Sequence, residues 1–237
     1  MTAWLTAHPI AHRGYHDLNG AIWENTLPAF QRAIDAGFAI ECDIHLSADG
    51  VPMVFHDDDL KRLCGREGEI EALTAAEARQ VPVGGTTATI PSLSDLLDAT
   101  AGKVALVIEL KSSKADPAAF ARATLDALED YRGPVALMSF DAEILSALKQ
   151  AGSRFPLGLT AEGRDEDAIA RHHEAFAIGL DFVSYYYDDL PNDFVTGARA
   201  KGVPVITWTV RNEKARAHTF QHADQMTFEG FDPRESA

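Results

Sequence analysis

The first quarter of the chain carries residues whose types and spacing suit metal-assisted phosphate chemistry. His12-Arg13-Gly14 closes the apolar stretch Pro9-Ile10-Ala11, Glu41-Cys42-Asp43 lies on a second apolar stretch, and Phe55-His56-Asp57 follows soon after. Together these segments offer two histidines, an arginine and two carboxylates spaced two apart. Such groups can bind a divalent metal, hold an anionic phosphate and transfer protons. The first hypothesis is therefore a metal-assisted phosphodiesterase.

The two-residue period of a β-strand decides which of these side chains face the same way. Glu41, Asp43 and His45 share one face of their expected strand, and Glu109 and Lys111 share a face of a later strand. If both faces open into one site, the carboxylates would repel one another, and a divalent cation would compensate them. Ligation by oxygen alone favours Mg²⁺ or Ca²⁺ over zinc. His45 either touches the substrate or ends its strand at solvent, and the sequence leaves both readings open.

The elements that must position these groups alternate between short apolar and amphipathic segments, a pattern typical of repeated β–α units. We expect strands at residues 9–13, 39–45, 104–111, 134–139, 155–159, 182–186, 204–210 and 225–228. We expect helices at residues 25–36, 94–99, 117–128, 142–151, 166–178, 193–201 and 213–222, several of them ended by a glycine. Eight such units predict a closed (β/α)₈ TIM barrel, with the active site at the carboxyl ends of the strands. An open doubly wound sheet is the alternative, but no Gly-x-Gly-x-x-Gly turn follows the first strand.

One stretch interrupts the alternation. Residues 47–92 are rich in loops and are expected to be an insertion after the second strand that partly covers the site. Asp49-Gly50 predicts a hairpin turn that joins residues 44–46 to 52–55. The whole chain, residues 1–237, is expected to be a single barrel domain.

Composition and charge exclude several classes of function. The net charge of −15 disfavours nucleic acid and anionic membranes as partners. No apolar run approaches the roughly 20 residues of a membrane-spanning helix, and the start of the chain lacks the pattern of a secretory leader. Cys42 and Cys64 form no disulfide framework. We therefore expect a cytoplasmic enzyme with a small-molecule substrate and no stable membrane association, whose oligomeric state the sequence does not reveal.

Further motifs follow in order along nearly the whole chain, from about residue 9 to residue 228. They are His12-Arg13-Gly14, Glu24-Asn25-Thr26, Ala29-Phe30, Gly37, Glu41-x-Asp43, Asp49-Gly50, Val54-Phe55-His56-Asp57, Pro91-Ser92-Leu93, Glu109-x-Lys111, Ser139-Phe140 and Trp208-Thr209-Val210. This series resembles the glycerophosphodiester phosphodiesterase family, among the phospholipase C-like phosphodiesterase barrels. The resemblance implies a (β/α)₈ barrel that hydrolyses glycerophosphodiesters to sn-glycerol 3-phosphate and an alcohol with a divalent metal.

The resemblance also implies a role for each matching residue. Glu41, Asp43 and Glu109 would bind the metal. His12 and His56 would be the general acid and base. Arg13 and Lys111 would hold phosphate oxygens, and Trp208 would line the substrate pocket.

The chain departs from the family pattern at a few positions. At residues 224–229 this chain has Asp-Gln-Met-Thr-Phe-Glu, where relatives usually have a strand with a sequence like Asp-Gly-Ile-Ile-Thr-Asp. We therefore assign no ligand role to Glu229. His16 and Asp17, in the loop after the first strand, are expected to be exposed. Tyr185-Tyr186-Tyr187 alternates at a strand end, where one or two of the rings could face the pocket while at least one packs against helices.

Two other functions compete with the first hypothesis. A lysophospholipase D or sphingomyelinase D-like phosphodiesterase could use the same barrel, although no amphipathic anchor is evident. A non-catalytic phosphodiester-binding protein should have lost some of the catalytic set, whereas His12, His56, Glu41, Asp43 and Glu109 are all present.

Overall fold

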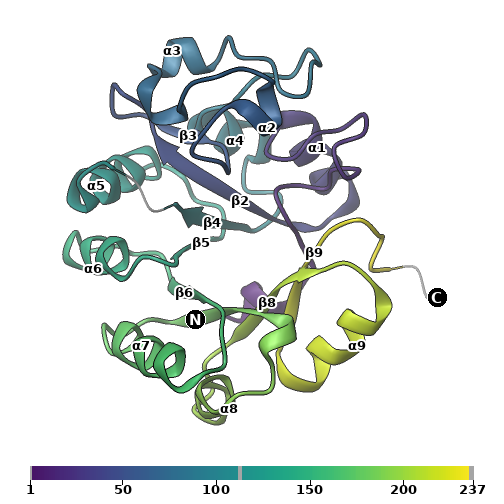
Figure 1. The fold of residues 1–237 in the computed structure, drawn as a ribbon, viewed down its shortest axis with the longest axis vertical. Coiled ribbons are helices and arrows are strands. Elements are labelled where there is room, and N and C mark those ends of the chain that lie inside the picture. Colours follow the sequence, from purple (N-terminus) through teal and green to yellow (C-terminus); the bar gives the residue numbers. More distant parts are fainter. Residues whose placement is uncertain (1, 112–113, 235–237) are drawn as a thin grey trace.

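A closed barrel of parallel strands forms the centre of the computed structural model, which describes residues 2–111 and 114–234 (Figure 1). Within these residues the barrel strands are β1 (Ile10–Ala11), β2 (Ala39–Leu46), β4 (Leu106–Leu110), β5 (Val135–Ser139), β6 (Leu157–Ala161), β7 (Phe182–Tyr186), β8 (Val205–Val210) and β9 (Gln225–Phe228). Strand β1 closes the ring because Ile10 pairs with Ala39 of β2 on one side and with Thr227 of β9 on the other. The expected (β/α)₈ barrel is confirmed.

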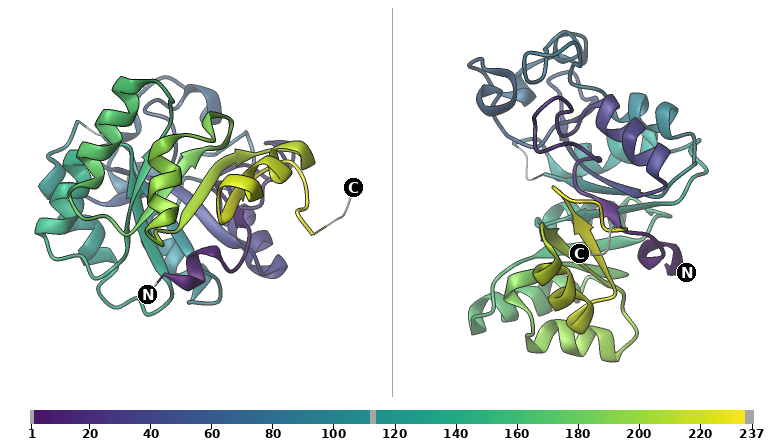
Figure 2. Two further views of the ribbon diagram at one scale, coloured as in Figure 1. Left: turned by 90° about the horizontal axis from the view of Figure 1, so that it is seen from below. Right: turned by 90° about the vertical axis from the view of Figure 1, so that its right-hand side faces the viewer.

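Helices cover the outside of the barrel and return the chain from each strand to the next (Figures 1 and 2). They are α1 (Leu27–Ala36), α4 (Leu93–Thr100), α5 (Pro117–Ala127), α6 (Ala142–Gln150), α7 (Glu166–Phe176), α8 (Asp193–Ala200) and α9 (Glu213–His222). Helix α1 shows how local sequence fixes the bounds: a proline stands in its first turn, and Gly37 ends it with a left-handed φ of 74°. Among residues 2–111 and 114–234, we find no helix that is both long and apolar enough to cross a membrane.

Two apolar layers hold the barrel together. The larger lies between the outward faces of the strands and the helices, and includes Ile40, Ile108 and Phe228. The smaller fills the inside of the barrel, where Val107, Phe182 and Ile206 are buried. Leu5, from the 3-10 turn η1 (Ala3–Thr6), joins this inner layer. The inside of the barrel is therefore a packed core below the site, as is usual for this fold.

The stretch after β2 forms a separate lobe, at the top of Figure 1. It contains β3 (Pro52–Val54), α2 (Lys61–Cys64), the 3-10 turn η2 (Ile70–Ala72) and α3 (Ala75–Ala78). Strand β3 pairs antiparallel with the end of β2, as the Asp49-Gly50 turn predicts. The lobe has its own apolar cluster, which includes Phe55, Leu60 and Ile70.

Several observed boundaries differ from the expected ones by one or two residues, and two of these differences have a clear physical reason. Strand β6 occupies residues 157–161, two residues later than expected, because Leu157 and Leu159 supply the outward-facing core contacts. Helix α4 is capped by Ser92 rather than begun at Ser94. The Ser92 side chain accepts a hydrogen bond from the Asp95 backbone N–H, and the Asp95 carboxylate accepts one from the Ser92 backbone N–H.

Candidate active site

Three buried carboxylates meet at the carboxyl ends of two neighbouring strands. Glu41 and Asp43 lie on β2, and the register that pairs Asp43 with Glu109 of β4 brings the third beside them. Each residue is at most 5% exposed. Their ligand oxygens all lie within 4.8 Å of one another. This geometry suits a single cation held by oxygen ligands.

The electrostatics of this group favour a bound cation. Burial and the neighbouring charges of Asp43 and Glu109 raise the pKa of Glu41 well above its ordinary value. Burial also raises the pKa of Glu109. The pKa of Asp43 moves the other way: burial raises it, but the combined positive charges of Arg13, His56, Lys111 and His12 outweigh burial and lower it. Two of the three carboxylates are thus short of positive charge, and a divalent ion would supply it.

Arg13 and Lys111 give the site its protein cations. Arg13 Nε lies 3.3 Å from Asp43 Oδ2. Lys111 Nζ lies 2.7 Å from Glu109 Oε1 and 3.6 Å from Asp43 Oδ1. The backbone of Arg13 is left-handed (φ 53°), and in this conformation its N–H donates to Glu41 Oε2. A strained backbone at such a point is common in functional sites.

Asn25 also belongs to the site, although no individual role is predicted for it from the sequence. Its Nδ2 donates to Asp43 Oδ2 at 2.9 Å, and its backbone is left-handed (φ 54°). Its Oδ1 is buried and has no hydrogen-bond partner among the described residues. A buried amide oxygen without a partner, next to three carboxylates, fits a region that holds a cation. The only early signal was its place in the Glu24-Asn25-Thr26 motif.

His12 stands at the end of β1 on the other side of Glu41. Its Nε2 lies 4.0 Å from Glu41 Oε2, and its Nδ1 lies 2.5 Å from Glu229 Oε2. Burial lowers the pKa of His12, and the hydrogen bond to Glu229 offsets part of that effect. An imidazole that is neutral near physiological pH can accept a proton.

His56 enters the site from the lobe after β2. The backbone N–H of Phe55 donates to the carbonyl of Asp43, which places the next residue, His56, beside the carboxylates. Its Nδ1 lies 2.7 Å from Asp57 Oδ1, and Arg62 donates to both oxygens of Asp57. The His56 side chain is 28% exposed, so it can meet a substrate that enters from solvent.

These groups open into one small cavity of about 50 Å³. It is lined by His12, Arg13, Glu41, Asp43, His56, Glu109, Lys111, Met138, Phe140, Trp208 and Thr227. The structure thus brings together every residue that the sequence predicts for the site. Trp208 lies on β8 within the irregular register between Thr207 and Val210. Phe140 and Tyr186 pack against its ring, at centroid distances of 5.5 and 5.2 Å.

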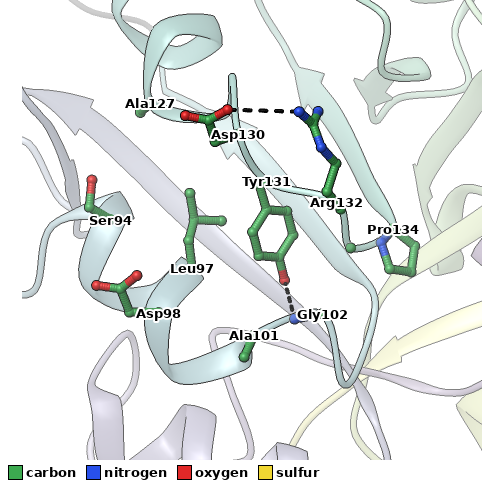
Figure 3. A pocket seen from close by; sticks show the side chains of 11 residues that line it. Ser94, Leu97, Asp98, Ala101, Gly102, Ala127, Asp130, Tyr131, Arg132 and Pro134 are labelled. Atoms are coloured by element: carbon green, nitrogen blue, oxygen red, sulfur yellow. Dashed lines mark hydrogen bonds and ion pairs between the residues drawn. The ribbon is translucent and has the colours of Figure 1, made fainter.

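A larger cavity of about 690 Å³ lies between α4 and α5, and no histidine or carboxylate of the site lines it (Figure 3). Two pairs of its polar groups contact each other: Gly102 N–H donates to the Tyr131 hydroxyl, and Arg132 lies 3.7 Å from Asp130. The chemistry therefore points to the smaller cavity.

Two histidines depart from the sequence predictions. His16 is 5% exposed rather than open to solvent, because its loop folds back onto the end of β9. His45 neither lines the cavity nor reaches solvent. It is fully buried, with Nδ1 3.2 Å from Glu71 Oε1 and Nε2 3.1 Å from the carbonyl of His56. His45 therefore ties the lobe to β2 beside His56.

The tyrosines at residues 185–187 do not all face the same way: as the sequence predicts, at least one of them packs against helices. Tyr185 is fully buried and faces the helices, where its hydroxyl contacts His172 Nδ1. Tyr186 turns to the other face and packs on Trp208.

Comparison with known proteins gives a consistent result. The sequence model of the glycerophosphoryl diester phosphodiesterase family matches residues 12–230. A glycerophosphodiester phosphodiesterase of Caldanaerobacter subterraneus subsp. tengcongensis is 29% identical over 213 residues, which cover 85% of this chain and 84% of that protein. One of Bacillus subtilis is 25% identical over 231 residues, which cover 86% of this chain and 76% of that protein.

Solved structures share the fold. A phosphodiesterase of Oleispira antarctica, in complex with the product sn-glycerol-3-phosphate, superposes with a TM-score of 0.81 at 24% identity and covers 93% of this chain and 92% of its own. A glycerophosphodiester phosphodiesterase of Thermotoga maritima has a TM-score of 0.73 at 25% identity, with 92% of each chain covered.

Proposed function

The chain belongs to the glycerophosphoryl diester phosphodiesterase family, and we propose that it hydrolyses glycerophosphodiesters to sn-glycerol 3-phosphate and an alcohol. The relatives named above support this substrate class, as does the glycerol phosphate product held by the protein from Oleispira antarctica. One observation from the site supports it most: two imidazoles, two protein cations and three buried carboxylates line the same small cavity.

A divalent cation, Mg²⁺ or Ca²⁺, would be held by Glu41, Asp43 and Glu109. When bound, the ion supplies positive charge to the non-bridging oxygens of the phosphodiester. Arg13 and Lys111 lie against the same carboxylates and can hold those oxygens from the protein side.

His12 and His56 would move the protons of the reaction. One imidazole accepts the proton of the attacking hydroxyl as the new P–O bond forms. The other donates a proton to the leaving alcohol as the old P–O bond breaks. The attacking group can be water, which gives glycerol 3-phosphate directly, or the 2-hydroxyl of glycerol, which gives a cyclic phosphate whose P–O bond to the 2-oxygen is then opened by water. Both routes use the same two histidines.

The aromatic side of the cavity would bind the organic part of the substrate. Phe140 and Trp208 line it, and Phe140 is 43% exposed at the rim. The buried indole Nε1–H of Trp208 has no hydrogen-bond partner among the described residues, so it could donate a hydrogen bond to a substrate oxygen. The small volume favours a compact polar group such as glycerol phosphate deep in the site.

The test is the release of glycerol 3-phosphate by purified protein from the choline, ethanolamine, inositol and glycerol esters. The assay is run on metal-stripped protein and again after Mg²⁺ or Ca²⁺ is restored. We expect release only with metal. Cleavage of lysophospholipid in its place would establish the phospholipase D reading. If folded, metal-loaded protein cleaves neither the glycerophosphodiesters nor lysophospholipid, a non-catalytic binding role would be favoured.

A further inference from the structure

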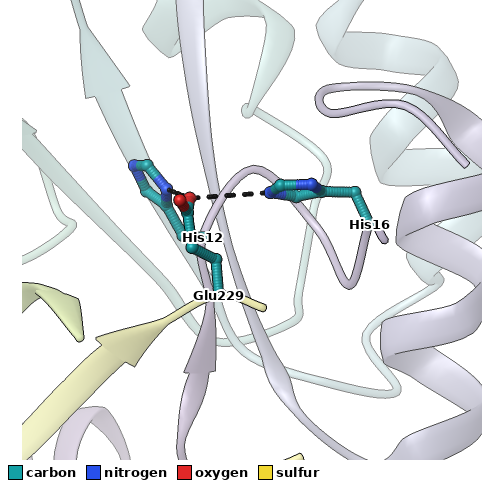
Figure 4. Close-up of side chains that lie close together, drawn as sticks. All are labelled: His12, His16 and Glu229. Carbon is teal, nitrogen blue, oxygen red and sulfur yellow. Dashed lines mark hydrogen bonds and ion pairs between the residues drawn. The ribbon is translucent and has the colours of Figure 1, made fainter. Parts of the chain in front are cut away.

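Glu229 follows β9 at the mouth of the barrel, and its backbone is held from both sides. Its N–H donates to the carbonyl of Val210 on β8, while the carbonyl of the preceding Phe228 accepts from the N–H of His12 on β1. The side chain then turns toward His12 (Figure 4). Its place is thus fixed by the pairing of three strands rather than by a loose loop.

Three basic side chains surround the Glu229 carboxylate. Oε2 lies 2.5 Å from His12 Nδ1 and 3.6 Å from His16 Nε2. Oε1 lies 2.6 Å from Arg211 Nε. Both oxygens therefore accept from the protein, and the arginine fixes which oxygen faces the imidazoles.

Two histidines and a carboxylate could also suggest a second metal site, but the proton of His16 argues against it. The backbone N–H of Leu18 donates to His16 Nδ1 at 3.1 Å, so the imidazole proton must sit on Nε2, the atom that faces Glu229. A metal there would need the Nε2 lone pair and would force a proton onto Nδ1, against the Leu18 N–H. The hydrogen bonds of the cluster are those of His12 and Arg211 to Glu229, and the Nε2 proton of His16 faces the same carboxylate from 3.6 Å.

We infer that Glu229, held by Arg211, is a positioning residue. It keeps the proton of His12 on Nδ1 and directs the free Nε2 lone pair toward the carboxylates of Glu41, Asp43 and Glu109. The inference rests on the proposed function, in which His12 transfers a proton. His12 Nδ1 must donate, because an ionised carboxylate offers only lone pairs. Nε2, which lies 4.0 Å from Glu41 Oε2, is then the atom that can accept a proton in the reaction. A carboxylate fixes the catalytic imidazole of serine hydrolases in the same way.

The second histidine has the same arrangement. His56 Nδ1 contacts Asp57, which Arg62 holds. Both imidazoles of the site therefore present Nε2 and are backed by a carboxylate–arginine pair, although the two pairs come from unrelated parts of the chain. This repetition supports a role in chemistry rather than a chance surface pair.

Glu229→Gln is the decisive variant because Arg211 will orient the amide. The arginine can bond only the amide oxygen, which leaves the NH₂ group facing His12 Nδ1. His12 must then accept at Nδ1 and carry its proton on Nε2, the reverse of the wild type. We expect kcat to fall by roughly 10³ to 10⁴-fold with little change in KM. Glu229→Asp keeps the charge and should recover part of the loss.

Asp224→Asn is the matched control. Asp224 precedes the other end of β9 and also accepts from an arginine, Arg199, but it contacts no residue of the site. Its kcat should stay at the wild-type level. The thermal midpoint of each variant shows whether it is folded.

The tautomer of His12 is read directly by two-bond ¹H–¹⁵N correlation spectra of histidine-labelled, metal-loaded protein. The expected result is Nδ1–H in the wild type and Nε2–H in Glu229→Gln. Wild-type kcat in folded Glu229→Gln, or a lost kcat with an unchanged tautomer, would overturn the inference. Failure of the proposed function looks different: the wild type would release no glycerol 3-phosphate, or His12→Ala would remain active.

Discussion

His12 and His56 differ in exposure but face the same cavity, so each should be indispensable. Replacing either with alanine removes one proton-transfer group, and we expect turnover to fall by about 10² to 10⁴-fold while the fold is kept. His172→Ala is the control: His172 contacts Tyr185 outside the cavity, so its loss should lower stability and leave kcat unchanged. Steady-state release of glycerol 3-phosphate measures all three. Near-normal turnover in His12→Ala would remove it from the catalytic pair.

Glu41 should matter most for the metal, since it is the carboxylate whose ionised form is most in need of positive charge. Glu41→Gln keeps the shape of the side chain but removes the charge. We expect the affinity for Mg²⁺ or Ca²⁺ to fall by at least about tenfold in calorimetric titration, by analogy with the loss of other metal-site interactions. An unchanged dissociation constant would take Glu41 off the ligand set.

At the scale of elements, Glu24 joins the loop after β1 to helix α2 of the lobe. Arg13 and Arg62 both donate to its carboxylate, which is 4% exposed. Although burial opposes the effect, the hydrogen bond from Arg62 and the charge of Arg13 lower the pKa of Glu24 to about 2. The ionised form is thus favoured by folding.

A pH dependence of stability follows. A carboxylate whose folded pKa lies below its unfolded value of 4.5 stabilises the protein fully above that pH, and the contribution is lost as pH falls toward about 2. The amount is at most about 3 kcal/mol. Urea unfolding at a series of pH values should give a shallower acid decline for Glu24→Gln than for the wild type. The exposed Glu67→Gln, in the same lobe, controls for the loss of one negative charge. Parallel curves for Glu24→Gln and wild type would contradict the prediction.

The elements themselves were largely predictable from sequence, and so was the meeting of the candidate site residues at one cavity. Apolar runs with a two-residue period and glycine stops are local signals, so β2, β7 and α9 could be placed closely. Contacts between distant segments have no such signal. Glu229 lies 217 residues from His12 in the chain, and only closure of the barrel between β9 and β1 brings them together. The roles of His16 and His45 were hidden for the same reason.

At the scale of the whole molecule, some residues of the inner core can be changed without touching the cavity. Leu5 is 1% exposed in the inner core, away from the cavity. Leu5→Ala should cost about 2 to 5 kcal/mol of unfolding free energy and leave kcat unchanged. Leu18→Ala, at a position 60% exposed, should change stability by less than about 0.5 kcal/mol. Chemical denaturation measures the change in unfolding free energy, and the phosphodiesterase assay measures kcat. A fall in kcat in folded Leu5→Ala would show that the inner core and the site are coupled.

Metal binding should nevertheless stabilise the entire chain, because the carboxylates that would hold the ion come together only when β2 and β4 pair. A ligand that binds only the folded state adds about 2.7 kcal/mol at one hundred times its dissociation constant. For a chain of this length that corresponds to a rise in thermal midpoint of about 5 to 10 °C. Mg²⁺ or Ca²⁺ added to metal-stripped protein should produce this rise in the wild type and in His172→Ala. Glu41→Gln should show at most about half of this rise at the same concentration, because a tenfold weaker affinity reduces the added stability to about 1.4 kcal/mol. Equal shifts in all three proteins would place the ion elsewhere on this acidic chain, and the three carboxylates would then need another explanation.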